Sequence, residues 1–197
     1  MTEDERVSTG VPGWNEVLNG GLRPQQNALI RGPPGAGKTT FGLHFLAQGI
    51  EADETALFIN LGEPEEYVRR TAEHYGMSHD AIHFLDLAPT DEQFSGDETY
   101  TLFSSAEVEQ PSFVQEIRRT IDELSPNRVL LDPITEFRYL APDDHQFRKQ
   151  ILSFLDYLRS NEATVLLTSQ ASPTLPDDDL QFLTDAVVNL EATDELR

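Results

Sequence analysis

The sequence predicts one α/β domain whose mostly parallel central sheet is flanked by helices on both faces. Short continuous runs rich in Val, Ile and Leu alternate along the chain with longer amphipathic segments, as strands and helices do in parallel α/β proteins. A glycine-rich turn joins the first apolar run to the first amphipathic segment, the order found in strand–loop–helix phosphate sites. The 197 residues suffice for a single domain with its own core, and we expect residues 1–197 to form one.

Three strands and two helices are predicted in the first half of the chain. The strands are the apolar runs at residues 27–31, 55–61 and 82–87. Apolar residues with helical spacing predict helices over residues 38–49 and 65–75. The second of these helices is expected to end at Gly76, because glycine readily adopts the left-handed conformation of a helix C-cap.

The second half of the chain continues the alternation after a polar interruption. Residues 88–110 are predicted to be an exposed loop. Pro111 then stands where a helix can begin, since proline is well tolerated in the first helical turn. The predicted helices here are residues 112–124 and 143–160, and the predicted strands are residues 128–132, 163–169 and 186–190.

The composition excludes several classes of partner. Lys and Arg total 14 and Asp and Glu total 35, so the formal charge is −21. Such a surface repels phosphate backbones, which disfavours binding to nucleic acid or to anionic membranes. The absence of cysteine excludes a disulfide framework and thiolate metal sites. Residues 1–10 lack the apolar core of a secretory signal, and no apolar run approaches the ~20 residues that span a bilayer, so we expect a cytoplasmic protein.

Two explanations of the acidity remain open. The charge excess resembles that of proteins from halophilic microbes, in which an acidic, lysine-poor surface stays soluble and salt screens its self-repulsion. Only two lysines occur, Lys38 and Lys149. On this explanation the source is expected to be a halophilic archaeon. The alternative is an acidic face that binds a protein partner.

Residues 32–40, GPPGAGKTT, match the phosphate-loop pattern G-x-x-x-x-G-K-[ST] in full. Glycines let backbone N–H groups approach phosphate oxygens, and the following helix N-terminus adds to this anion site. We expect the Lys38 ammonium to reach the β- and γ-phosphates and the Thr39 hydroxyl to ligate Mg²⁺. The sequence therefore predicts ATP and Mg²⁺ as ligands. The residues expected to hold the nucleotide are Gly32, Pro34, Gly35, Ala36, Gly37, Lys38, Thr39 and Thr40.

A second metal-binding group is expected at the end of a neighbouring strand. Residues 129–132 are three apolar residues followed by Asp132. Ligands of parallel α/β sheets bind at the carboxyl ends of the strands, so this carboxylate is placed to hold Mg²⁺ through water. The alternative is that Asp132 merely ends its strand before Pro133.

The segment STGVPGWNEVLNGGL, residues 8–22, followed by GPPGAGKTT, resembles the start of a KaiC-type domain of the RecA-like P-loop ATPase superfamily. The segments RVLLDPIT and ATVLLTSQ also fit that order of elements, and the resemblance spans residues 7 to about 191. It implies an ATP-binding core that assembles into rings, with nucleotide between subunits. It also implies roles of the kind such proteins have, in circadian timing, signal transduction or DNA recombination.

The catalytic residues are where this chain departs from the resemblance. KaiC-like domains end their second strand in two adjacent glutamates that polarise the attacking water. Here Gly62 stands at the first position and Glu63 at the second. Glycine has no side chain to reach the water, so either Glu63 alone supports slow hydrolysis or turnover is negligible. Glu136 is a third, weaker candidate base.

Further expectations concern the end of the chain. The resemblance implies a further β-hairpin with a Lys/Arg pair that reaches the neighbour's γ-phosphate. This chain stops at EATDELR, so we expect either that the hairpin is missing or that the protein has been shortened. Gln170 follows a strand where RecA-like proteins keep a γ-phosphate sensor; alternatively it simply faces water. Residues 170–180 carry three aspartates and no basic residue, the opposite of a nucleic-acid funnel. Trp14 is expected to pack in the core or at a hinge; the alternative is a platform on which a base stacks.

These observations favour an ATP- and Mg²⁺-binding P-loop domain with a regulatory or signalling role, weak hydrolysis and either self-association or a protein partner. An accessory ATPase of DNA recombination is the first alternative, although the chain shows no basic stripe. A non-hydrolysing interaction module with a degenerate site is the second, because Gly62 replaces a glutamate.

Overall fold

The computed structural model describes residues 5–87, 112–141, 143–170 and 177–191. Within them, six strands form one sheet in the order β3-β2-β4-β5-β1-β6, and every pairing in that sheet is parallel. The strands are β1 (Asn27–Arg31), β2 (Ala56–Asn60), β3 (His83–Asp86), β4 (Arg128–Asp132), β5 (Thr164–Thr168) and β6 (Ala186–Asn189). The predicted α/β fold is confirmed, with a sheet that is entirely parallel.

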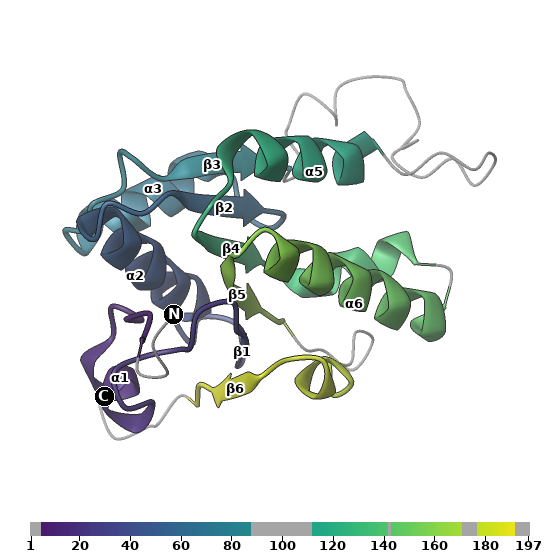
Figure 1. Cartoon of the computed structure of the whole chain (residues 1–197), viewed down its shortest axis with the longest axis horizontal. Helices are drawn as coiled ribbons and strands as arrows, with labels where there is room; N and C mark the ends of the chain where they lie inside the picture. The colour runs from purple at the N-terminus through teal and green to yellow at the C-terminus, as the bar shows by residue number, and fades with distance from the viewer. Residues whose placement is uncertain (1–4, 88–111, 142, 171–176, 192–197) are drawn as a thin grey trace.

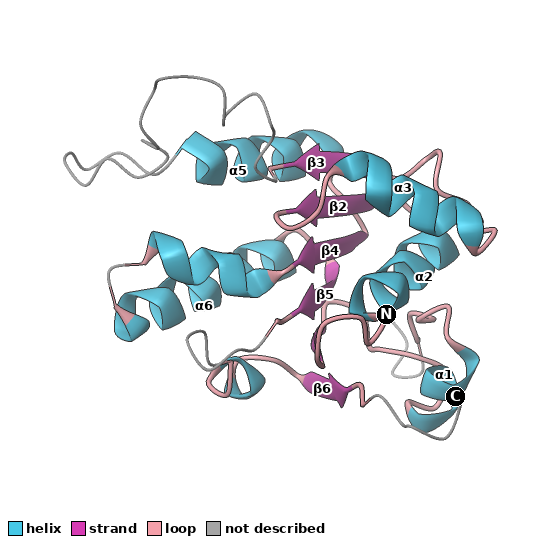
Figure 2. Cartoon of the chain, turned by 180° about the vertical axis from the view of Figure 1, so that it is seen from behind, coloured by secondary structure: helices cyan, strands magenta, loops and turns pink. Residues whose placement is uncertain are grey.

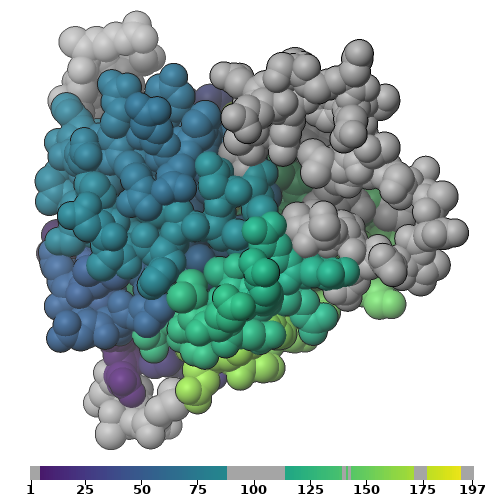
Figure 3. All heavy atoms as spheres, turned by 90° about the horizontal axis from the view of Figure 1, so that it is seen from above, coloured from purple at the N-terminus to yellow at the C-terminus, as the bar shows by residue number. Residues whose placement is uncertain are grey.

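Helices cover both faces of this sheet, as predicted. Figures 1 and 2 show α1, α2 and α3 on one face and α5 and α6 on the other. Their bounds are α1 (Pro12–Val17), α2 (Lys38–Glu51), α3 (Glu65–His74), α5 (Ser112–Leu124) and α6 (Asp144–Ser160). Seen from above, the teal residues that include α3 and the green residues of α5 share one surface of the molecule (Figure 3).

Strands β1 to β5 each contribute side chains to two separate cores, because successive side chains point to opposite faces. In β4, Val129 and Leu131 pack in the core beneath α5 and α6, whereas Leu130 packs in the core beneath α2 and α3. Gly42 lets α2 lie close to the sheet, since a Cβ there would stand 2.5 Å from the methyl carbons of Leu130. The doubly covered sheet explains why the strands read as continuous apolar runs.

A buried arginine joins the N-terminal segment to the sheet. Arg128 begins β4 and forms an ion pair with Glu54. Its guanidinium also donates to the carbonyl oxygens of Ser8, at 2.5 Å, and Phe45, at 3.0 Å. These bonds hold residues 8–22 beside α2, where Trp14 is buried against Phe41.

The structure differs from the sequence expectations mainly at the ends of elements and in short helices. Most strands are one or two residues shorter than predicted, α2 extends to Glu51, and α6 begins after Asp143, whose carboxylate caps it. Helix α1 and two 3-10 helices, Ile134–Leu140 and Leu180–Phe182, were not predicted. The expected loop 88–110 lies outside the described residues. No helix in the described part of the chain is long and apolar enough to cross a membrane.

Candidate functional site

The loop between β1 and α2 has the conformation that its glycines make possible. Gly35 and Gly37 have φ angles of 77° and 89°, in the left-handed region that other residues rarely adopt. Among the described residues, no side chain caps α2, so none of them offers a side-chain acceptor to its first-turn N–H groups. Uncapped N–H groups and the positive end of the helix dipole together favour an anion at this point.

Lys38 folds back over this loop. Its Nζ donates to the carbonyl oxygens of Gly32, at 2.8 Å, and Pro33, at 2.9 Å. Burial lowers the pKa of Lys38 below its ordinary value, against the opposing effect of the Asp132 and Asp177 charges. The ammonium is therefore held above the loop backbone in a poorly hydrated place, where a negatively charged ligand would interact with it strongly.

Asp132 stands at the carboxyl end of β4, next to the start of α2. The Thr39 hydroxyl donates to one carboxylate oxygen of Asp132 at 2.5 Å, and the Thr168 hydroxyl donates to the other. Burial raises the pKa of Asp132 above its usual range, while the hydrogen bonds from Thr168 and Thr39 and the Lys38 charge favour the ionised form. A hydroxyl and a carboxylate side by side are the hard oxygen donors that suit Mg²⁺.

One cavity of about 300 Å³ brings most of the predicted site residues together at the carboxyl ends of the strands. It is lined by nine of them: Pro34, Gly35, Gly37, Lys38, Thr39, Thr40, Glu63, Asp132 and Gln170. Gly32 and Ala36 belong to the loop but do not line the cavity, and neither does Glu136. Asn60, Val68, Thr71 and Pro133 line it without having been singled out in the sequence.

The turn after β2 forms one wall of this cavity. Gly62 lies against the turn that follows β4, the neighbouring strand in the sheet. A Cβ at Gly62 would stand 3.1 Å from Cδ of Pro133. Glu63 follows and is exposed; among the described residues, none hydrogen-bonds its carboxylate. The turn thus brings a free carboxylate to the edge of the phosphate loop.

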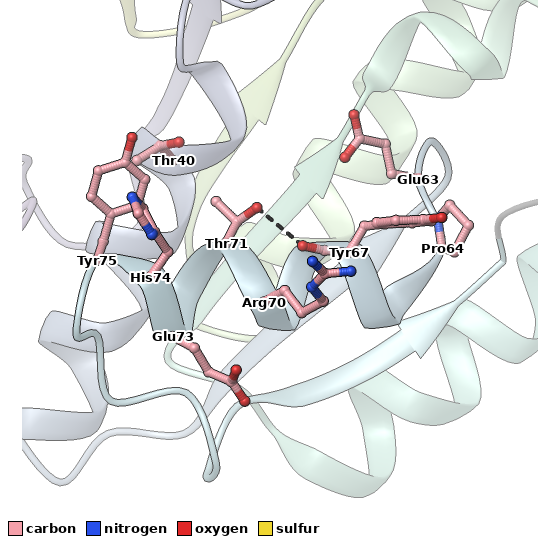
Figure 4. Close-up of a pocket in the computed structure, with 9 residues that line it drawn as sticks. All are labelled: Thr40, Glu63, Pro64, Tyr67, Arg70, Thr71, Glu73, His74 and Tyr75. Atoms are coloured by element: carbon pink, nitrogen blue, oxygen red, sulfur yellow. Dashed lines mark hydrogen bonds between the residues drawn. The ribbon is translucent and has the colours of Figure 1, made fainter.

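A broad groove of about 1060 Å³ continues from this cavity along α3. Thr40, Glu63 and Thr71 line both spaces, so the two are contiguous. Thr40, on α2, and Tyr75, just after the end of α3, both line this groove (Figure 4). Tyr67 and Tyr75 are each 57% exposed, so the groove offers aromatic surface to a ligand. No sequence pattern pointed to this groove, because it arises where α3 packs beside α2.

The acidic segment that follows residue 176 is tied to the sheet. Asp177 is buried and accepts hydrogen bonds from Arg31, at 3.1 and 2.5 Å, and from the Ser169 hydroxyl. Asp178 also pairs with Arg31, at 2.9 Å. Because Arg31 immediately precedes Gly32, this cluster connects the phosphate loop to the end of β5. The sequence indicated only that the aspartates repel nucleic acid, whereas Asp177 has a structural role.

Replacing Asp177 by Asn is expected to lower the free energy of unfolding by about 2 kcal/mol at pH 7, as the charge-assisted bonds are lost. Burial alone would raise the pKa of Asp177, but the bonds from Arg31 and Ser169 and the Arg31 charge lower it overall. A lowered pKa gives stability that is present above the unfolded value, about 3.9, and is lost below it. Urea unfolding at pH 7 and pH 3.5 checks this: the difference between wild type and variant should shrink at acid pH, and a constant difference would contradict it.

His74, His79, His83 and Arg69 do not line the phosphate cavity. His74, His79 and His83 form no metal cluster with other residues in the described part of the chain. Arg69 pairs with Glu65 at 2.6 Å, and its guanidinium also lies over the ring of Phe84.

Comparisons with known proteins agree on one family. A family profile described as KaiC ATPase matches residues 7–195. A UPF0273 protein of Methanopyrus kandleri is 35% identical over 137 residues, covering 66% of this chain and 54% of that protein. A UPF0273 protein of Thermotoga maritima is 28% identical, covering 86% and 72%. The circadian clock oscillator protein KaiC of Parasynechococcus marenigrum is 27% identical, covering 84% of this chain but only 32% of the clock protein. The chain thus spans about half of the first relative.

Proposed function

This chain belongs to the KaiC family of ATPases, and from that premise we propose that it binds ATP with Mg²⁺ and hydrolyses it slowly in a regulatory or signalling role. The observation that carries the proposal is the single cavity in which Lys38, Thr39, Asp132 and Glu63 meet at the phosphate loop. A phosphate loop, an ammonium, two oxygen ligands and a free carboxylate are the groups that triphosphate chemistry requires.

The triphosphate is bound by the loop and by Lys38. The N–H groups of the loop and of the first turn of α2 donate to phosphate oxygens, and the Lys38 ammonium leaves the carbonyls of Gly32 and Pro33 for the β- and γ-phosphates. The oxygens of Thr39 and Asp132 would hold Mg²⁺. When bound, this ion neutralises charge on the phosphates.

Hydrolysis needs a water in line with the γ-phosphate. The water oxygen forms a bond to phosphorus as the bond to the β–γ bridging oxygen breaks, and ADP leaves with that electron pair. The Glu63 carboxylate accepts the proton of the water, and Gln170, on the same cavity, donates to the γ-phosphate. With Gly62 in place of the family's first glutamate, only one carboxylate orients the water, so turnover is slow.

The groove along α3 receives the nucleoside. It opens from the phosphate cavity at Thr40 and Thr71, and it presents the exposed rings of Tyr67 and Tyr75, on which a purine can stack. The net charge of −21 disfavours a longer nucleic acid as the ligand. We propose further that the protein works in a salt-rich cytoplasm and associates with copies of itself or with a protein partner.

Nucleotide titration and phosphate release at high salt test this function. Glu63→Gln should lower the rate of phosphate release roughly a hundredfold, the effect of removing a general base, while ATP affinity stays close to wild type. Gly62→Glu should raise the rate by adding a second carboxylate. Gly62→Ala is its matched control, since it makes the same 3.1 Å approach to Pro133 without a carboxylate.

Three outcomes would contradict the proposal. A wild type that binds no ATP would point to an interaction module with a degenerate site. ATP binding with unchanged turnover in Glu63→Gln would remove Glu63 from the mechanism. Phosphate release that single-stranded DNA stimulates, with a steep dependence on salt, would favour a recombination ATPase.

A further inference from the structure

Asn60, the last residue of β2, is a buried amide at the foot of the turn that carries Glu63. Only 1% of the surface of Asn60 is exposed, and the residue lines the phosphate cavity. Burying an amide is unfavourable unless its polar atoms are bonded, so the partners of Asn60 show what it does.

Within the described part of the chain, the partners of the Asn60 amide lie in or beside that turn. Its Nδ2 donates to the carbonyl oxygen of Glu63 at 2.5 Å, and its Oδ1 accepts from the N–H of Gly62 at 3.3 Å. One side chain therefore holds the main chain of two successive residues. These opposite demands also fix the orientation of the amide, because its donor faces a carbonyl and its acceptor faces an N–H.

A second carboxylate extends the bonds past Glu63. Asn60 Nδ2 also donates to Asp86, at the end of β3, at 2.9 Å. The other oxygen of Asp86 accepts the N–H of Glu65, at the start of α3, at 3.4 Å. Residues before and after Glu63 are thus both fixed through Asn60 and Asp86, whereas no described residue bonds the Glu63 carboxylate itself. Figure 4 shows that carboxylate pointing away from α3.

We propose that Asn60 is the positioning residue of the catalytic turn: it fixes the main chain of Glu63, and thereby the place of a carboxylate that no described residue bonds. This inference rests on the proposed function of Glu63 and adds a residue that acts through it. Positioning matters here because a displacement of about 1 Å in a reacting group can slow a reaction by a hundredfold. With Gly62 providing no second carboxylate, the turn depends on one group alone.

The test uses Asn60→Asp, which keeps the shape and the acceptor but replaces the donor by an oxygen facing the Glu63 carbonyl. We expect phosphate release in a single turnover to slow about tenfold or more, with the Kd for ATP and Mg²⁺ within about twofold of wild type. In the Glu63→Gln background the same change should have no further effect. Asn127→Asp is the matched control. The Oδ1 of Asn127 also bonds the main chain, accepting the N–H of Thr55, but at the amino ends of the strands, away from the phosphate cavity.

The double variant Asn60→Asp with Asp86→Asn separates positioning from structure. It restores a donor and an acceptor between positions 60 and 86, so urea stability should recover, but the Glu63 carbonyl still faces an oxygen and turnover should stay low. Recovery of turnover along with stability would overturn the inference. So would an Asn60→Asp effect that persists in Glu63→Gln.

Binding of ADP with aluminium fluoride, a mimic of the transferring phosphate, covers the case of negligible turnover. Asn60→Asp should weaken it at least about tenfold relative to binding of ADP. Equal binding in variant and wild type would overturn the inference alone. A wild type that binds neither nucleotide would overturn the proposed function, and the inference with it.

Discussion

Replacing Lys38 by Met should raise the Kd for ATP at least about a hundredfold, a loss near 3 kcal/mol. The ammonium is held 2.8 and 2.9 Å from two carbonyl oxygens of the loop, with burial lowering its pKa, so its charge is poorly screened by water. A phosphate that reaches this place gains a strong charge-assisted bond that methionine cannot supply. Isothermal titration at fixed salt measures the loss directly.

Lys149→Met is the natural control, because it removes the only other lysine and lies on the exposed side of α6. Its ATP affinity should equal that of wild type at every salt concentration. A Lys38 variant that retained wild-type affinity would show that the loop does not bind the triphosphate. Loss of affinity in both variants would instead indicate a nonspecific effect of net charge.

The phosphate site could be predicted from the sequence because its parts are local or periodic. The whole phosphate loop lies in one contiguous segment, residues 32–40. The apolar residues before Asp132 predict a strand, and Asp132 stands at its carboxyl end. Parallel strands bring such ends to one edge of the sheet, so the cavity joining Lys38, Thr39 and Asp132 follows from topology.

What could not be predicted depends on pairings between distant residues. Asn60 and Asp86 meet because β2 and β3 are neighbours in register, and an isolated Asn at a strand end carries no such signal. In the sequence, Asp177 is one of three consecutive aspartates that an exposed loop would explain. In the structure it is buried, because Arg31, the last residue of β1 and 146 residues earlier, bonds its carboxylate. Helix α1 could not be predicted from apolar periodicity, because it is six residues long and buries one side chain, that of Trp14.

Asp132→Asn should weaken ATP binding in the presence of Mg²⁺ about tenfold or more and remove most of the dependence of affinity on Mg²⁺. The variant loses the negative charge that suits a divalent cation, although the amide can still bond Thr39 and Thr168. Titrations of ATP with and without Mg²⁺ measure the effect. Asp156→Asn, on the outer surface of α6, controls for the change in net charge.

The same substitution should make the protein without ligand more stable, which a purely structural aspartate would not do. Burial raises the pKa of Asp132, so at pH 7 its ionised form opposes folding, and a neutral amide of the same shape removes that penalty. Because the raised pKa makes protonation favour the folded state, the advantage of the variant should shrink as the pH falls through that pKa. A variant that is less stable than wild type and still responds to Mg²⁺ would assign Asp132 to the core rather than to the metal.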